Sequence, residues 1–399
     1  MLARLHGRVV LVWGAIPGER VTARVERIGK GVVYADTADV LTASPDRRPD
    51  VGDWRCGGNV LAFIAYPRQL QLKGQIIQDA LARIGRLPIA PPDVIGSPEE
   101  GYRMRARLHA SHGHLGFYRE GTHTICGVGQ TRQLAAATTA WIEQVDRRVG
   151  RATLAGLAAM EVSENIAGDE RACHLDLHAG ADPLQFAPLA DGLVGLSTSR
   201  ADRAGVDVLA GTPTLTDTVG GVVLRRDVRA FFQGNRYLVD RLVGHVASLV
   251  PEGSVVDLYA GVGLLGLSLA TSRDAAITVV EGDPVSGEDL TTNAAPFGER
   301  VRVERRSVEH FVALARDRQD DLTAATMIVD PPRTGMTREA LAGAIGLQPA
   351  SIVYVSCDVA TFARDTRTLI DAGYELQALT GLDLFPNTAH VESIALFSR

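Results

Sequence analysis

The sequence predicts an α/β protein in three parts: a small β-barrel, a central α+β region and a C-terminal, Rossmann-like parallel sheet. Three observations support this prediction. Short strand-like runs crowd the first 42 residues, prolines punctuate residues 88–98, and continuous apolar runs recur at regular intervals in the last third. Apolar strands that alternate with helices form parallel sheets covered on both faces. We expect the barrel at residues 1–45, a linker and helix at 46–98, the central region at 99–225 and the domain with the parallel sheet at 226–399.

Composition narrows the class of protein. The 399 residues are 46% hydrophobic and 22% charged, with a formal net charge of −6, which excludes disordered, collagen-like and coiled-coil chains. No apolar run reaches the roughly 18 residues of a membrane span. Because the start lacks signal-peptide features and the four cysteines lie far apart, we expect a cytoplasmic protein. The mild negative charge alone gives no case for nucleic acid, so a basic surface must be local.

The first hundred residues contain strands, a linker and a helix. Val9–Trp13, Arg20–Ile28 and Gly31–Ala35 are separated by turn residues, and such a density of short strands is typical of a small barrel. Residues Ser44–Cys56 are rich in Pro, Asp and Arg and indicate a linker. Apolar residues recur at helical spacing over Gln69–Ile84.

The rest of the chain divides into a strand-rich centre and a periodic last third. In the centre we expect a helix near Leu134–Val149 and strands near Ala158–Glu164 and Ala172–Leu177. In the last third, five apolar runs predict parallel strands: Val255–Tyr259, Ile277–Glu281, Val301–Glu304, Met327–Asp330 and Ile352–Val355. Tyr374–Thr380 and Val391–Leu396 are expected to form a terminal antiparallel pair.

A glycine loop follows the first parallel strand. Gly261, Gly263 and Gly266 match the dinucleotide fingerprint, and Glu281 ends the next strand at the required distance. Asp257, however, would repel a pyrophosphate and attract the ammonium and sulfonium groups of S-adenosylmethionine. The loop therefore favours S-adenosylmethionine. A nicotinamide-dependent oxidoreductase, or a capping role for Asp257, remains an alternative.

Candidate chemistry follows the later strands. Asp330 begins a stiff Asp-Pro-Pro-Arg-Thr-Gly loop, and Cys357 leaves a strand for a predicted helix. A helix N-terminus lowers a thiol pKa, and the thiolate is the attacking form. Glu392 precedes an apolar strand, where a carboxylate is costly unless it is used. The alternatives are a strand-exit Asp, a buried structural Cys and a strand-edge Glu.

Taken together, these motifs resemble the RNA uracil-5-methyltransferase family, which methylates uridine C5 in tRNA or 23S rRNA with S-adenosylmethionine. The matching segments are Asp257–Gly263, Asp330–Gly335, Ser356–Asp365 and Phe385–Glu392. Residues 1–45 resemble the family's TRAM domain, an RNA-binding barrel. Tyr102–Arg107 and Leu115–Arg119 resemble its central domain.

The resemblance implies roles for individual residues. Cys357 would add to uridine C6 as the nucleophile, which makes C5 able to take the methyl group, and Glu392 would then remove the C5 proton. The expected cofactor or target-base residues are Gln233, Asp257, Tyr259, Gly261, Gly263, Glu281, Ser307 and Asp330.

The chain departs from the family pattern at several positions. Many members hold an iron–sulfur cluster through four cysteines, but Cys56-Gly-Gly-Asn keeps one of them, and Cys126 only lies near the distal position. Because four thiolates are the usual requirement, we expect no cluster and no metal site. Leu264 and Ser307 replace expected polar residues at the cofactor, and Asp358-Val359 replaces the commoner Asn-Pro.

A local basic surface is expected on the central region. Alternation along one strand points Arg103, Arg105 and Arg107 to the same face. Cationic and aromatic side chains contact phosphates and stack on unpaired bases. The expected substrate-binding residues are Arg103, Arg105, Arg107, Phe117 and Arg333, with Lys73, Arg83 and Arg86 extending the patch. A solvated face with acidic neighbours is the alternative.

These expectations define the partners. We expect a monomeric enzyme that acts on RNA, with the target uridine flipped out of its stack. We expect neither DNA nor a membrane as a partner. A non-catalytic RNA-binding or RNA-folding protein that retains the methyltransferase fold is the alternative.

Overall fold

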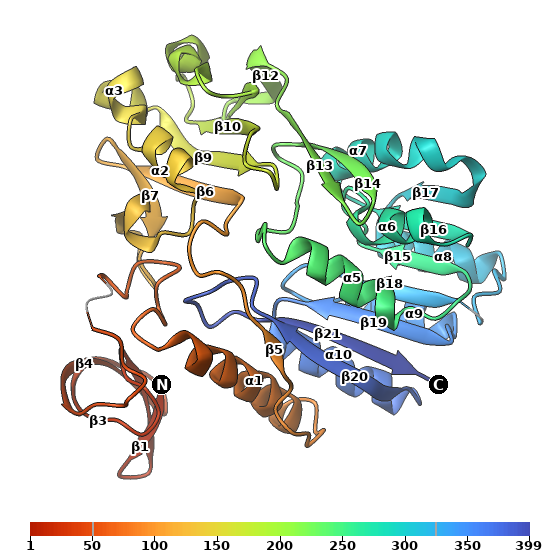
Figure 1. Cartoon of the computed structure of the whole chain (residues 1–399), viewed down its shortest axis with the longest axis horizontal. Helices are drawn as coiled ribbons and strands as arrows, with labels where there is room; N and C mark the ends of the chain where they lie inside the picture. The colour runs from red at the N-terminus through yellow and green to blue at the C-terminus, as the bar shows by residue number, and fades with distance from the viewer. Residues whose placement is uncertain (50–51, 324) are drawn as a thin grey trace.

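The computed structural model describes residues 1–49, 52–323 and 325–399. Figure 1 shows an N-terminal sheet, a central sheet with its helices, and a C-terminal sheet covered by helices. Within the described ranges no helix is both long enough and apolar enough to cross a bilayer.

The N-terminal sheet has four strands in the order β1-β2-β4-β3, and it is strongly curled (Figure 1). Its strands are β1 (Leu2–Leu5), β2 (Arg8–Trp13), β3 (Arg20–Ile28) and β4 (Val32–Thr42). Strands β2 and β4 pair in parallel and β3 pairs with β4 in antiparallel. The linker then leads to helix α1 (Tyr66–Arg83), which begins with a proline in its first turn, where the missing N–H has no cost.

The central sheet has seven strands in the order β12-β11-β10-β9-β6-β7-β8. Its strands are β6 (Arg105–Ser111), β7 (His114–Tyr118), β8 (Ile125–Gly127), β9 (Leu157–Glu164), β10 (Arg171–Leu177), β11 (Gly195–Arg200) and β12 (Arg203–Gly211). The single helix expected near residues 134–149 is instead split into α2 (Ala136–Ile142) and α3 (Val145–Val149), and a short α4 (Arg151–Leu154) follows. Trp141, Ile142 and Val145 from these helices pack in one apolar cluster with the sheet.

A hairpin of β13 (Thr214–Val219) and β14 (Val222–Asp227) leads into the C-terminal sheet. This sheet has eight strands in the order β17-β16-β15-β18-β19-β21-β20-β5. Its strands are β5 (Val94–Ile95), β15 (Val255–Leu258), β16 (Ile277–Glu281), β17 (Val301–Arg305), β18 (Thr326–Val329), β19 (Ser351–Ser356), β20 (Glu375–Leu382) and β21 (Glu392–Ser398). The five predicted parallel strands are present, and β20 and β21 pair in antiparallel as expected.

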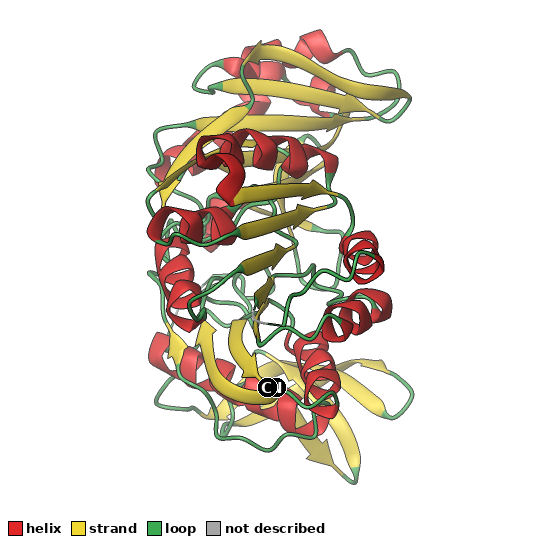
Figure 2. Ribbon diagram, turned by 90° about the vertical axis from the view of Figure 1, so that its right-hand side faces the viewer, coloured by secondary structure: helices red, strands yellow, loops and turns green. Residues whose placement is uncertain are grey.

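Helices cover both faces of this sheet, as Figure 2 shows. They are α5 (Val239–Leu249), α6 (Leu264–Ser272), α7 (Pro284–Ala294), α8 (Val308–Asp317), α9 (Arg338–Gly346) and α10 (Val359–Asp371). Successive strand residues enter different cores: Val255 packs with α5, α6 and α7, whereas Val256 packs with α8, α9 and α10. Burial on both faces explains why these strands are continuous apolar runs.

The strand order places the candidate motifs together. It reverses between β15 and β18, and ligands of such sheets bind at this switch point, outside the carboxyl ends of the strands. The loops that begin at Tyr259, Asp330 and Cys357 all leave this edge. Segments far apart in the sequence therefore meet in one place.

Candidate active site

The glycine loop forms a tight connection between β15 and α6. Gly261 and Gly263 have φ values of +57° and +101°, which favour glycine, and Tyr259 takes a φ of +63°. The Gly261 N–H donates to Glu281 Oε2 at 2.7 Å. The carboxylate expected at the ribose therefore also braces the loop.

Asp257 is buried and lines a pocket together with Tyr259 and Gly261 of this loop. Its Oδ2 accepts a hydrogen bond from the Gly266 N–H at 2.8 Å, while its Oδ1 is buried with no partner among the described residues. Burial raises the pKa of Asp257 to about 8. A buried, half-satisfied carboxylate fits a cationic ligand, so the donor set suits the ammonium and sulfonium groups of S-adenosylmethionine.

Other expected cofactor residues take two different positions. Gln233, Tyr259 and Asp330 line one pocket with Asp257 and Gly261, and Leu264 lines it too, adding apolar contact where a polar residue was expected. Ser307 is not among these lining residues. Ser307 lies beside Gly282: a Cβ added to Gly282 would come within 3.2 Å of the Ser307 Cα. The Ser307 hydroxyl accepts a hydrogen bond from the His310 N–H and so caps α8.

Strand register brings the expected nucleophile and base together. In the antiparallel pair β19–β21, Ser356 lies opposite Ser393. If the register is continued by one residue, Cys357 lies opposite Glu392. Directly opposed residues have Cβ atoms about 4.5–5.5 Å apart. The charge on Glu392 acts on the Cys357 thiol, as expected for neighbouring side chains.

The environment of Cys357 differs from the expected one. Burial, reinforced by the charges of Glu392 and Asp330, raises the pKa of the thiol to about 11, and Arg333, which hydrogen-bonds the thiol, only partly opposes this. Asp358 caps α10 and accepts from the N–H groups of Ala360 and Thr361. The expectation of a lowered thiol pKa was therefore wrong, because burial and the charges of two carboxylates raise it.

Glu392, which is buried, and Asp330, which is half-buried, form an acidic pair whose charges act on each other. The exposed fraction of Glu392 is only 2%, and burial, together with the charge of Asp330, raises its pKa well above the usual value. Burial also raises the pKa of Asp330 to about 7, although Gln233 Nε2 donates to Asp330 Oδ2 at 3.0 Å. Two adjacent carboxyls that resist joint ionisation can hold a proton near neutral pH, which suits acid–base chemistry.

The arginines expected to contact substrate have varied surroundings. Arg333 is exposed at the site. Arg103 lies close enough to Arg333 and to His390 to interact electrostatically with both. Its guanidinium also donates to Gln133 Oε1 at 2.7 Å. Arg105 pairs with Glu161, and Arg107 pairs with Asp176 at 2.6 Å. The strand face therefore has features of both predicted alternatives. Its arginines alternate along the strand, as expected for a basic surface, but Arg105 and Arg107 are paired with acidic neighbours.

Two expectations about the RNA surface need correction. The exposed fraction of Phe117 is 6%, and its ring packs in the central core beneath the Arg103 guanidinium, so it offers no exposed face for stacking. Lys73 is fully buried and does not extend a basic patch. Its Nζ pairs with Asp383 at 2.5 Å and donates to the Phe385 carbonyl at 3.0 Å.

Sequence reasoning missed the contacts that support the turn before Glu392. Besides Lys73, helix α1 supplies Gln69, which exchanges hydrogen bonds with Asn387, and Tyr66, whose hydroxyl donates to Asp383. The available signal was the spacing of Tyr66, Gln69 and Lys73, which places all three polar residues on one face of the helix.

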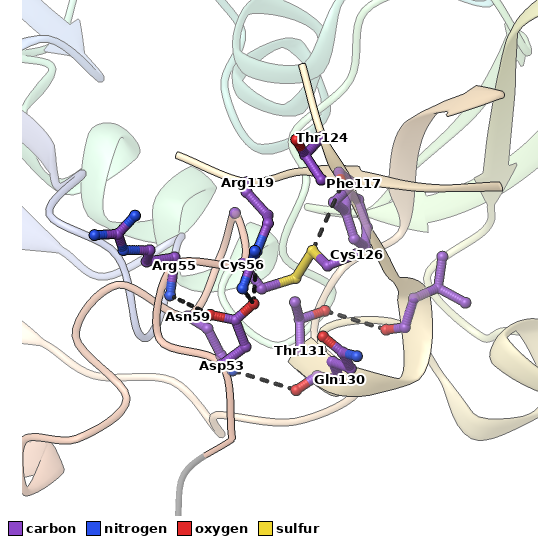
Figure 3. The surroundings of a disulfide bond; sticks show 12 residues. Asp53, Arg55, Cys56, Asn59, Phe117, Arg119, Thr124, Cys126, Gln130 and Thr131 are labelled. Atoms are coloured by element: carbon purple, nitrogen blue, oxygen red, sulfur yellow. Dashed lines mark hydrogen bonds and ion pairs between the residues drawn. A yellow bond between two sulfur atoms is a disulfide. The ribbon is translucent and has the colours of Figure 1, made fainter. Parts of the chain in front are cut away.

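Cys56 and Cys126 form a disulfide (Figure 3). It fastens the linker to β8, and Arg119 and Asp53 form an ion pair beside it. Cys173 is a free, buried cysteine. Among the residues that the structure describes, no group of three or more His, Cys, Asp or Glu side chains could hold a metal ion.

Comparisons with known proteins agree with this geometry. A model of the tRNA (uracil-5-)-methyltransferase family matches residues 220–399. An uncharacterized RNA methyltransferase of Gloeobacter violaceus is 30% identical, with 100% of this chain and 93% of that protein aligned. The 23S rRNA (uracil(1939)-C(5))-methyltransferase RlmD of Shewanella amazonensis is 28% identical over 99% of this chain and 92% of its own length.

One solved structure shares the whole fold. The Pyrococcus abyssi tRNA (uracil-54, C5)-methyltransferase, in complex with S-adenosyl-L-homocysteine, has a TM-score of 0.75 and 24% identity. The match covers 98% of this chain and 96% of that one.

Proposed function

The chain belongs to the RNA uracil-5-methyltransferase family, and we propose that it methylates its uridine through a transient bond between Cys357 Sγ and C6 of the ring. The enzyme is S-adenosylmethionine-dependent. The observation that carries the proposed mechanism is the β19–β21 register, which opposes Cys357 and Glu392 beside Asp330.

The proposed reaction uses the chain's residues in order. The Cys357 thiolate attacks C6, and the electrons of the C5=C6 bond move toward the C4 carbonyl, which makes C5 nucleophilic. S-adenosylmethionine supplies the methyl group, whose bond to the sulfonium breaks as the bond to C5 forms. Glu392 then removes the C5 proton, the C5=C6 bond re-forms, and the thiolate leaves.

Supporting roles are proposed for the neighbouring residues. Asp257 would hold the cofactor's cationic end and Glu281 its ribose, while Asp330, held by Gln233, would accept a hydrogen bond from the uracil ring. Arg333 partly opposes the rise in the pKa of Cys357, so it would favour the attacking thiolate. The curled N-terminal sheet and the central sheet would bind the surrounding RNA.

A covalent trap tests the mechanism. In the presence of S-adenosylmethionine, RNA carrying 5-fluorouridine at the target takes the methyl group at C5 but then offers no proton for Glu392 to remove, so the wild type should remain attached and migrate as a complex on a denaturing gel. Peptide mapping should find the RNA on Cys357, and Cys357→Ala should give no complex. Continued methylation by Cys357→Ala would refute the covalent route.

Under this proposal the target is an unpaired uridine within a structured RNA. The names of the two characterised relatives specify 23S rRNA and tRNA respectively. Transcripts of both RNAs, incubated with labelled S-adenosylmethionine and then mapped for 5-methyluridine, would distinguish the two classes.

A further inference from the structure

A surface cavity of about 600 Å³ lies in the central region, away from the catalytic residues. It opens beside the β6–β7 turn and β8, and α2 and α3 close its far side. Pockets for small organic groups typically have volumes of about 300–1,000 Å³. None of the expected catalytic, cofactor or substrate residues lines it, so the mechanism leaves it without a role.

The titratable groups of this cavity are three imidazoles and two carboxylates, and Ser111 and Thr124 add hydroxyl groups. His112, His114 and His123 lie at one side, and Glu143 and Asp146 come from the helical side. Within the described part of the chain, neither carboxylate has an ion pair with another residue. These five side chains do not form a metal site by geometry. Two carboxylates also disfavour a phosphate, so the expected ligand is neutral and rich in N–H donors.

The apolar part of the cavity suits a flat ring. Leu115, Ile125, Ile142 and Leu154 contribute apolar surface below the polar groups. A nucleobase has this combination, because its faces are apolar and its edges carry N–H groups. Unpaired bases are commonly stacked on aromatic side chains, including His, and hydrogen-bonded along their edges. Carboxylates accept from exocyclic amino groups such as that of cytosine.

A row of side chains connects the cavity with the active site. Arg103, near Arg333, begins the series that continues through Arg105 and Arg107 to His109 along β6. Six residues of strand span roughly 20 Å, which a few nucleotides can cover. At the far end, the His109 ring stacks on Tyr118 with centroids 3.8 Å apart.

The row then reaches the cavity itself. Tyr118 meets His123 edge-to-face with centroids 5.5 Å apart, and His123 lines the cavity. Tyr118 is 37% exposed, so the aromatic row lies at the surface. An RNA strand that leaves the catalytic pocket along β6 would therefore pass the mouth of the cavity.

We propose that this cavity binds a second unpaired base of the RNA substrate, one that carries an exocyclic amino group. The inference rests on the proposed function, because it assigns a further contact to the same RNA. His123 and His114 provide the stacking and hydrogen-bonding side, and Glu143 and Asp146 accept from the amino group. Uracil, which has no amino group, fits this site less well than guanine, cytosine or adenine.

Steady-state kinetics on two substrates tests the proposal. One substrate is a full RNA hairpin, and the other is a uridine-centred trinucleotide, too short to reach the cavity. His123→Ala combined with Glu143→Gln should raise KM for the hairpin about ten-fold and leave its kcat unchanged. KM for the trinucleotide should not change. His178→Ala, an exposed histidine of the same region, is the matched control and should change neither value.

Direct binding gives a second measurement. Titrating the protein with guanosine, adenosine, cytidine and uridine, monitored by NMR, should show uridine binding most weakly, and the double variant should lose this preference. An unchanged KM for the hairpin, or equal binding of all four nucleosides, would overturn the proposal. Trapping of a 5-fluorouridine trinucleotide by the same variant reports separately on the catalytic mechanism, so the two proposals fail independently.

Discussion

Replacing Glu392 by glutamine should have opposite effects on two steps of the reaction. The Glu392 charge is the largest electrostatic cause of the raised Cys357 pKa after burial. Removing that charge lowers the thiol pKa and increases the thiolate fraction at every pH at which Glu392 is ionised in the wild type. The same change removes the group that we propose accepts the C5 proton. We therefore expect faster attachment to RNA and blocked release.

The size of the first effect has a ceiling set by the structure. The pKa of Cys357 is raised from 9.0 to about 11, so at pH 7.5 about one thiol in 3,000 is ionised, against about one in 30 without any shift. Full removal of the shift would accelerate attachment about 100-fold. Because burial is the larger cause, a several-fold acceleration is expected. Loss of a positioned base typically slows turnover by about 10²–10⁴.

Rapid mixing with 5-fluorouridine RNA at several pH values measures attachment, and gels with ordinary RNA and S-adenosylmethionine measure release. Glu392→Gln should reach a given trapping rate at a lower pH than the wild type. With ordinary RNA it should accumulate a methylated covalent complex. Cys357→Ala is the control for attachment. Slower trapping by the glutamine variant, or free release of methylated RNA, would refute the reasoning.

Two further changes test the cofactor site and the core. Asp257→Asn keeps the side-chain shape but removes the charge, so the Kd for S-adenosylmethionine, measured by calorimetry, should rise by about ten-fold or more. In the wild type the Kd should fall as the pH rises through 8, because Asp257 ionises there. The variant should lose that pH dependence. Arg226→Met leaves the buried Asp217 without its cation, and urea unfolding should show a loss of about 3–5 kcal/mol; a loss below 1 kcal/mol would contradict this.

The parallel sheet could be predicted because its signal is local. Each strand, buried on both faces, is a continuous apolar run, and the loops that follow such strands must meet at one edge. Asp257 lies inside the first of these runs, whereas Asp330 and Cys357 directly follow strands β18 and β19, so the approximate positions of all three could be predicted. This is why the site's location was predicted better than its chemistry.

The electrostatics could not be predicted, because they depend on residues paired across long distances. Alternation placed Arg105 and Arg107 on one face, but only the β6–β9–β10 pairing shows that Glu161 and Asp176 lie against them. Lys73 likewise has a partner 310 residues away. A sequence shows which residues are charged, whereas register and packing decide which charges remain unpaired.

Burial of the catalytic groups has a consequence beyond their pKa values. Thiolates, not thiols, react with oxidants and electrophiles, so a Cys357 pKa of about 11 keeps the resting nucleophile inert. Under the proposed mechanism, the same burial would limit protonation of the activated ring at C5 by water in place of methylation. The low resting thiolate fraction and the protection of the intermediate therefore arise from one cause. A more exposed cysteine would ionise more readily, and it would also be oxidised more readily and waste more of its intermediates.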